Sequence, residues 1–160
     1  MQNYHSDKAA ATVEERRFNA WLRTQGYSVF EASVAQDKRG VDSYAINGNR
    51  VIEFDVKSDG QAAKTGNVGV ELWTSYDSGR EDRPGWGTAV HCDWWVWLFR
   101  GTDTYVALKP EEVVPRLEEF KENFPIIPSY KDQGKTTFNL LLPWGRLDEL
   151  GLSYQQGQLK

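Results

Sequence analysis

Two acidic residues and a lysine stand at a spacing that is compatible with phosphoryl chemistry. Asp42 lies in the segment GVDSYAI, and Asp55 and Lys57 lie in RVIEFDVKS a short way further along the chain. In the second segment apolar residues alternate with charged ones, which is the pattern of a strand with one apolar face. Side chains two residues apart on a strand point to the same side, so Asp55 and Lys57 share the charged face.

The turn between the two segments decides whether Asp42 joins that face. Asn47-Gly48 is a strong hairpin signal. A two-residue turn there would place Asp42 opposite Glu53, and a four-residue loop would place it opposite Asp55. Both registers put Asp42 on the Asp55 face, about 5 to 8 Å away, and only an odd-length loop would send it to the other face.

A carboxylate pair beside a lysine has a defined set of chemical uses. Clustered carboxylates repel one another unless they hold a cation or keep a proton. Oxygen ligands without a neighbouring histidine or cysteine suit Mg²⁺ or Mn²⁺. A lysine beside them can orient a water or stabilise charge on a phosphate. The three residues therefore predict metal-assisted phosphodiester hydrolysis, while the alternative of a solvated, charged strand face fits the bare spacing as well.

The same residues resemble the core of the PD-(D/E)XK nuclease superfamily, in which an Asp on one strand is followed by (D/E)-x-K on the next. Asp42 matches the first acid, Asp55 the second and Lys57 the lysine, and Val41 stands in place of the Pro. The resemblance implies a restriction-endonuclease-like α/β (α+β) core with a central mixed sheet flanked by helices. It also implies dependence on Mg²⁺ or Mn²⁺ and DNA as the partner.

Many members of this superfamily carry a further Glu on the helix before the sheet. The segment ERRFNAWLRTQG is similar to that helix in archaeal Holliday-junction resolvases, and Glu15 has the matching spacing to the first core residue, Phe18. Glu14 lacks that spacing but lies nearer the apolar stripe, on the turn of Trp21. The resemblance implies Glu15 as a third metal ligand beside the two aspartates, with Glu14 as the alternative.

Four further residues are candidates for supporting roles. Glu71 alternates with apolar neighbours in NVGVELW, so it faces away from them, either toward the acidic cluster or into solvent. Arg80, Arg83 and Trp86 lie in the Gly-rich segment DSGREDRPGWG. An exposed aromatic ring beside arginines suits base stacking and phosphate contact, and an ordinary surface loop is the alternative. The tryptophans of DWWVWLFRG are predicted to pack in the core instead.

The elements that must position these residues follow from periodicity and turn signals. A helix is predicted from Thr12, as N-cap, to a stop at Gly26, with Phe18, Trp21 and Leu22 as its buried apolar stripe. The order helix, several strands, helix, strand predicts an α/β or α+β domain. The predicted strands are 27–33, 41–46, 50–58, 68–76, 93–101, 104–109 and 136–144, and the later helices are 110–124 and 146–151.

Composition sets the outer bounds. The 160 residues predict one nuclease domain, 1–160, whose residues 1–11 are expected to be flexible. No apolar run approaches about 18 residues and no signal-peptide pattern opens the chain, so no membrane partner is expected. The lone Cys92 fits a reducing cytoplasm, that of the host cell if a phage encodes the chain. With a net charge of −4, a DNA ligand would need local basic patches or a bound cation.

The sequence thus predicts a metal-dependent deoxyribonuclease, structure-specific or DNA-processing. Its first alternative is a non-catalytic nucleic-acid-binding protein with a degenerate nuclease fold. A second alternative, a tryptophan-rich carbohydrate-binding module, accounts for the aromatic residues but not for the acidic motif. The likeness to resolvases is compatible with a homodimer. Endonuclease or exonuclease action, and the form of the nucleic acid, stay open at this stage.

Overall fold

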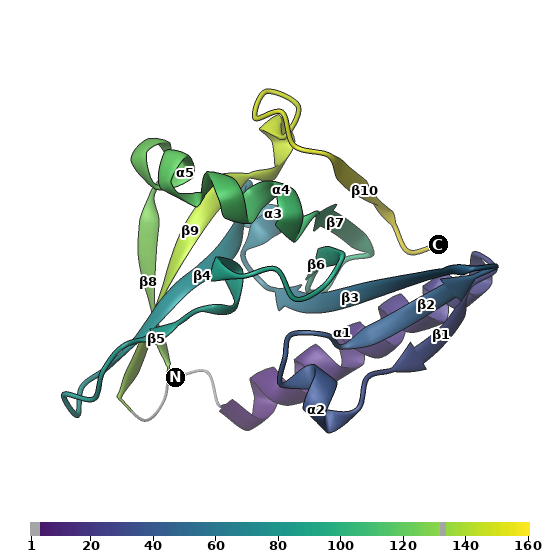
Figure 1. Cartoon of the computed structure of the whole chain (residues 1–160), viewed down its shortest axis with the longest axis horizontal. Helices are drawn as coiled ribbons and strands as arrows, with labels where there is room; N and C mark the ends of the chain where they lie inside the picture. The colour runs from purple at the N-terminus through teal and green to yellow at the C-terminus, as the bar shows by residue number, and fades with distance from the viewer. Residues whose placement is uncertain (1–3, 132–133) are drawn as a thin grey trace.

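A computed structural model describes residues 4–131 and 134–160 and shows the chain built around two β-sheets (Figure 1). The first sheet contains β1 (Ser28–Glu31), β2 (Ser43–Asn47), β3 (Arg50–Asp59), β6 (Trp94–Phe99), β7 (Thr104–Leu108) and β10 (Tyr154–Gln158), in that order across the sheet. The second contains β5 (Arg83–Pro84), β4 (Asn67–Tyr76), β9 (Lys135–Pro143) and β8 (Ile126–Lys131), again in order. Strands β3 and β6 run parallel and their other neighbours antiparallel, so the first sheet is mixed, as predicted.

The helices are few and mostly short. They are α1 (Tyr4–Thr24), α2 (Val34–Asp37), α3 (Ala62–Thr65), α4 (Pro110–Val113) and α5 (Leu117–Asn123), with 3-10 turns η1 (Trp86–Thr88), η2 (Val114–Arg116) and η3 (Trp144–Arg146). Across residues 4–131 and 134–160, none of them has the length and apolar character to cross a bilayer.

Helix α1 covers one face of the first sheet. Its buried residues Phe18 and Leu22 pack with Phe54 and Val56 of β3, which confirms the predicted apolar stripe. The helix begins at Tyr4, so the predicted N-cap at Thr12 is wrong. The run KAAA before that threonine consists of good helix formers, which carry the helix back toward the N-terminus. Of the segment predicted to be flexible, residues 1–3 lie outside the described part.

The second sheet packs against the opposite face of the first. Trp95 and Trp97 of β6 are 1% exposed and share a core with apolar side chains of β4 and β9, which confirms their predicted packing role. Among the described residues, the Trp95 and Trp97 rings are enclosed between the sheets and do not form an exposed row. The carbohydrate-module alternative loses the feature on which it depended.

Several elements differ from the sequence predictions. The sequence did not predict strands β5, β8 and β10. Strand β8 contains Pro128, which an edge strand tolerates because its N–H side can face solvent. The helix expected over 110–124 is broken into α4, η2 and α5 around Pro115, which lacks a backbone donor. Residues 147–151 form turns instead of a helix, and α2 and α3 occupy predicted loops.

Candidate active site

The β2–β3 hairpin fixes the relation between the two aspartates. Asn47 pairs with Arg50, so the turn residues are Gly48 and Asn49, not the predicted Asn47-Gly48. Gly48 has φ +61, a left-handed conformation that glycine adopts without strain. The register continues to Ser43 opposite Phe54, which places the preceding Asp42 beside Asp55, as predicted for the longer-loop register.

Strand β2 stops where the site begins. Beyond Phe54 no described strand pairs with that edge of β3, although β3 itself continues to Asp59. The Asp42 N–H donates to Phe54 O at 2.8 Å, and Asp42 Oδ2 accepts from the Val56 N–H at 2.7 Å. The Asp42 carboxyl therefore occupies the position that a longer β2 would have filled with a backbone carbonyl.

The second aspartate is buried against the first. Asp55 is 2% exposed, and its Oδ1 lies 2.7 Å from Lys57 Nζ. Burial, the neighbouring Asp55 charge and a hydrogen bond with Asp55 raise the pKa of Asp42 to about 9. A bond between two carboxyls requires a proton between them, so the pair holds one near neutral pH.

Helix α1 brings a third carboxylate to the same place. Glu15 lines the cleft with Asp42 and Asp55, and its pKa is raised by burial first and then by the charges of Asp37 and Asp55. Glu14 is buried on another side of the helix, where its Oε2 lies 2.9 Å from Arg17 Nη1. The structure thus brings Glu15, and not Glu14, to the acidic pair.

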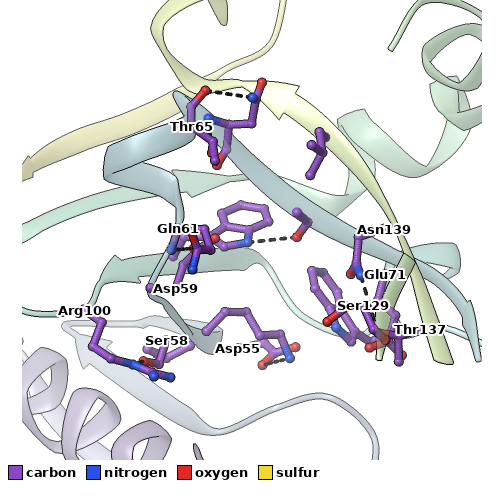
Figure 2. Close-up of a pocket in the computed structure, with 18 of the residues that line it drawn as sticks. Asp55, Ser58, Asp59, Gln61, Thr65, Glu71, Arg100, Ser129, Thr137 and Asn139 are labelled. Atoms are coloured by element: carbon purple, nitrogen blue, oxygen red, sulfur yellow. Dashed lines mark hydrogen bonds and ion pairs between the residues drawn. The ribbon is translucent and has the colours of Figure 1, made fainter. Parts of the chain in front are cut away.

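These side chains lie in a cleft of about 750 Å³ between the two sheets. Figure 2 shows Asp55, Ser58 and Arg100 on the side of the first sheet, with Glu71 and three neutral polar residues across from them. Those three are Ser129 of β8 and Thr137 and Asn139 of β9. Among the described charged residues that line the cleft, five are acidic and two, Lys57 and Arg100, are basic.

Comparison with known proteins supports the architecture. The chain is similar in structure to the bacterial homing endonuclease I-Ssp6803I, with a TM-score of 0.55 and 17% sequence identity over 69% of this chain and 73% of that one. The fold is restriction-endonuclease-like. No protein-family profile matches the sequence, and no curated protein matches it. At this identity the similarity shows the fold alone.

The donor set of this restriction-endonuclease-like cleft suits a hard divalent cation. A divalent cation could take the place of the proton between Asp42 and Asp55 and offset the charge of both carboxylates. In the conformation described, however, Asp42 bonds to Asp55 and to the Val56 amide, and Asp55 bonds to Lys57. Within residues 4–131 and 134–160, no three histidine, cysteine or acidic side chains converge as a metal site. A cation held by both aspartates and Glu15 would require their side chains to turn.

The remaining predicted residues fall in two groups. Glu71 of β4, for which the sequence left both a site-facing and a solvated position open, lines the cleft across from Asp55. Trp86 also lines it, but it is half-buried, packs edge-on against Trp95 at 5.1 Å between ring centroids, and lies 4.5 Å from Lys57 Nζ. Arg80 and Arg83 are exposed and outside the cleft lining.

Two glycines explain why Trp86 lies inside instead of on a surface loop. A Cβ on Gly85 would lie 2.3 Å from the Glu71 carbonyl oxygen, and one on Gly87 would lie 2.2 Å from Val70 Cγ1. Only glycine allows the backbone on both sides of Trp86 to approach β4 so closely. The ring is thereby held between the core tryptophans and Lys57.

Sequence reasoning missed Arg100, Ser129, Thr137 and Asn139. Arg100 directly follows the apolar strand β6, and no neighbouring sequence pattern marks it as a site residue. The three polar residues reach the cleft through the β8–β9–β4 pairing, and β8 itself was not predicted. Alternation in TTFNLLLPW is the one local signal that could have placed Thr137 and Asn139 on a shared face.

Proposed function

We propose that this chain is a Mg²⁺- or Mn²⁺-dependent deoxyribonuclease of the PD-(D/E)XK type. The observation that carries the proposal is the buried Asp42–Asp55 pair with Lys57 Nζ 2.7 Å from Asp55 Oδ1, in a cleft of a restriction-endonuclease-like fold. The structural likeness to a homing endonuclease supports DNA as the substrate.

The proposed roles follow from position. Asp42, Asp55 and Glu15 would hold the cation, which supplies a Lewis acid for a phosphate oxygen and lowers the pKa of a bound water. Lys57 orients the attacking water and stabilises the charge that develops on the phosphate. Asp55 contacts Lys57 directly, so it positions the ammonium group as well as contributing a ligand.

Two observations favour the non-catalytic alternative. Lys57 already forms an ion pair with Asp55, and the described acids do not converge as a three-ligand site. A fold that used these residues only for internal pairing would show the same contacts. Such a protein would bind nucleic acid without cutting it.

The deciding experiment is digestion of labelled DNA in single-stranded, duplex and branched forms, and of RNA, with Mg²⁺, Mn²⁺, Ca²⁺ or EDTA. Asp42→Asn is the matched variant, because an amide oxygen can still accept from the Val56 N–H while the side chain can no longer ionise to bind a cation. We expect cleavage of at least one DNA form by wild type in Mg²⁺ or Mn²⁺, none in EDTA and none by Asp42→Asn. Metal-independent cleavage, or full activity of the variant, would contradict the proposal. Binding without cleavage under all conditions would establish the non-catalytic alternative.

A further inference from the structure

The end of strand β6 places a second basic residue on the cleft. Arg100 follows directly after Phe99, and its N–H donates to Asp59 O at 2.7 Å. This bond continues the parallel ladder in which Ser58 pairs with Leu98 and Asp59 with Phe99. The backbone of Arg100 is therefore fixed to the far end of β3, the strand that carries Asp55 and Lys57.

The Arg100 side chain turns back along that strand. Its Nε donates to Ser58 Oγ at 3.2 Å, a contact that Figure 2 shows on the same side of the cleft as Asp55. A Cβ on Gly60 would lie 3.9 Å from Arg100 Nη1, so the guanidinium lies close to a residue without a side chain.

The two cleft cations are arranged in sequence along β3. Ser58, which holds the guanidinium, is one residue beyond Lys57, about 3.3 Å further along β3. The side chains of Lys57 and Ser58 leave opposite faces of the strand, and both residues line the cleft together with Arg100. A nucleic-acid strand laid along β3 with one phosphate at the Asp42–Asp55 pair would direct its next phosphate toward Arg100. A planar guanidinium binds phosphate through paired N–H donors, which a lysine cannot do.

We propose that Arg100, oriented by Ser58, binds the phosphate next to the one that is cleaved. This inference rests on the proposed nuclease function and adds a substrate-binding residue to it. It makes the cleft a site for a chain of at least two successive phosphodiesters. Arg100 serves binding and alignment, and Lys57 serves the reacting phosphate.

The test compares Arg100→Ala and Arg100→Lys with the control Arg146→Ala. Arg146 forms an ion pair with Glu149 at 2.8 Å and is not among the residues that line the cleft. The first readout is anisotropy of a labelled DNA oligonucleotide in Ca²⁺ at several salt concentrations. We expect Arg100→Ala to weaken binding roughly tenfold or more. The slope of log K against log salt should fall by about 0.7 to 0.9, the amount for one phosphate contact, while Arg146→Ala leaves both unchanged.

The second readout uses substrates in which one phosphate beside the cleaved bond is an uncharged methylphosphonate. Wild type should lose cleavage efficiency through KM when the phosphate on one particular side is neutralised. Arg100→Ala should be indifferent to that same replacement, and Arg100→Lys should lie between the two. Equal sensitivity of wild type and Arg100→Ala, or a salt slope that Arg100→Ala does not change, overturns the inference. A wild type that cuts nothing would refute the nuclease function, whereas the salt slope would still decide the phosphate contact; absence of DNA binding would refute both.

Discussion

The Lys57 ammonium group contacts a carboxylate and an aromatic ring. The Asp55 carboxylate contacts its Nζ at 2.7 Å, and the Trp86 ring centroid lies 4.5 Å from the same atom. An ammonium group beside an aromatic face and a carboxylate loses mobility, so its position is set before a substrate arrives. These contacts favour a role in which the Lys57 ammonium group acts from a fixed position.

Substitution Lys57→Ala should abolish most of the cleavage and leave the fold intact. The side chain is partly exposed and contributes charge to the reacting phosphate, so its loss should lower kcat by about 10²-fold or more. Single-turnover cleavage measures the loss of rate, and circular dichroism of the same preparation checks that the fold is intact. Wild-type rates in a folded Lys57→Ala protein would remove the lysine from the mechanism.

The two neighbouring glutamates of α1 should respond in opposite ways to amide substitution. Glu15→Gln removes a charge from an acidic cluster, so it should keep or raise stability while reducing metal affinity and turnover roughly 10- to 100-fold. Glu14→Gln breaks a half-buried ion pair with Arg17, so it should lower the melting temperature and leave the metal-dependent rate unchanged. Thermal melts and metal titrations of both variants provide the measurement. Equal effects of the two on turnover would contradict the assignment.

At the scale of the element, the hairpin couples folding to the charge of the site. The pKa of Asp42 is raised to about 9 in the folded chain from an ordinary value of 3.8, mainly by burial and by Asp55. The folded state therefore holds a proton that the unfolded state releases, and stability falls as pH rises through that window. We expect the melting temperature in EDTA to fall more steeply in wild type than in Asp42→Asn between pH 5 and pH 9. Added Mg²⁺ should raise it most at the alkaline end, because the cation replaces the proton; an identical pH profile for both proteins would contradict this.

The glycine-flanked Trp86 segment allows a second test at this scale. Gly87→Ala would bring a methyl group to 2.2 Å from Val70 Cγ1 and 2.7 Å from the Glu71 carbonyl oxygen. The forced shift should cost about 1 to 3 kcal/mol of unfolding free energy and displace the ring from Lys57. Gly145→Ala is the control, since no heavy atom lies within 4 Å of its added Cβ. Urea melts and tryptophan fluorescence of both variants would separate them, and equal stability would show that the segment adapts freely.

Local signals in the sequence were enough for the hairpin and the acidic motif. Alternation placed Asp55 and Lys57 on one face, and a turn signal near Gly48 brought Asp42 back to them, although the turn itself is displaced by one residue. Such features depend on neighbours in the chain. The acidic motif could therefore be predicted without any knowledge of the second sheet.

The features that sequence reasoning missed depend on contacts between distant segments. Arg100 reaches the cleft because β6 runs parallel to β3, which brings Leu98 beside Ser58. Trp86 is drawn inward by close contacts of Gly85 with Glu71, which no periodicity encodes. Pairing partners and backbone approach distances of this kind are properties of the assembled sheets.

At the scale of the whole molecule, the negative charge of the protein repels the proposed DNA substrate. The chain carries a net charge of −4, and acids outnumber bases along the cleft among the described residues. A phosphate that approaches a carboxylate at about 4 Å meets a repulsion of ~1 to 4 kcal/mol as the effective dielectric falls from water-like to about 20. A bound divalent cation offsets two such charges.

DNA binding should therefore be weak in EDTA and improve in Ca²⁺, which takes similar oxygen ligands and should support little or no cleavage. Asp55→Asn should bind better than wild type in EDTA and cut nothing. Anisotropy titrations at one fixed salt concentration measure both, because affinity depends steeply on ionic strength. If wild type binds equally well in EDTA and Ca²⁺ and Asp55→Asn changes neither, the acids do not face the phosphate.

The short β2 strand also gives the molecule an internal spectroscopic probe. The Val56 amide donates to the Asp42 carboxyl at 2.7 Å in place of a strand partner. The resonance of such an amide proton shifts when its acceptor gains or loses charge. One cross-peak of a ¹⁵N-labelled sample would then follow the site through a pH or metal titration, with neither DNA nor turnover required. Hydrogen exchange at this amide would report how often its hydrogen bond to the Asp42 carboxyl breaks.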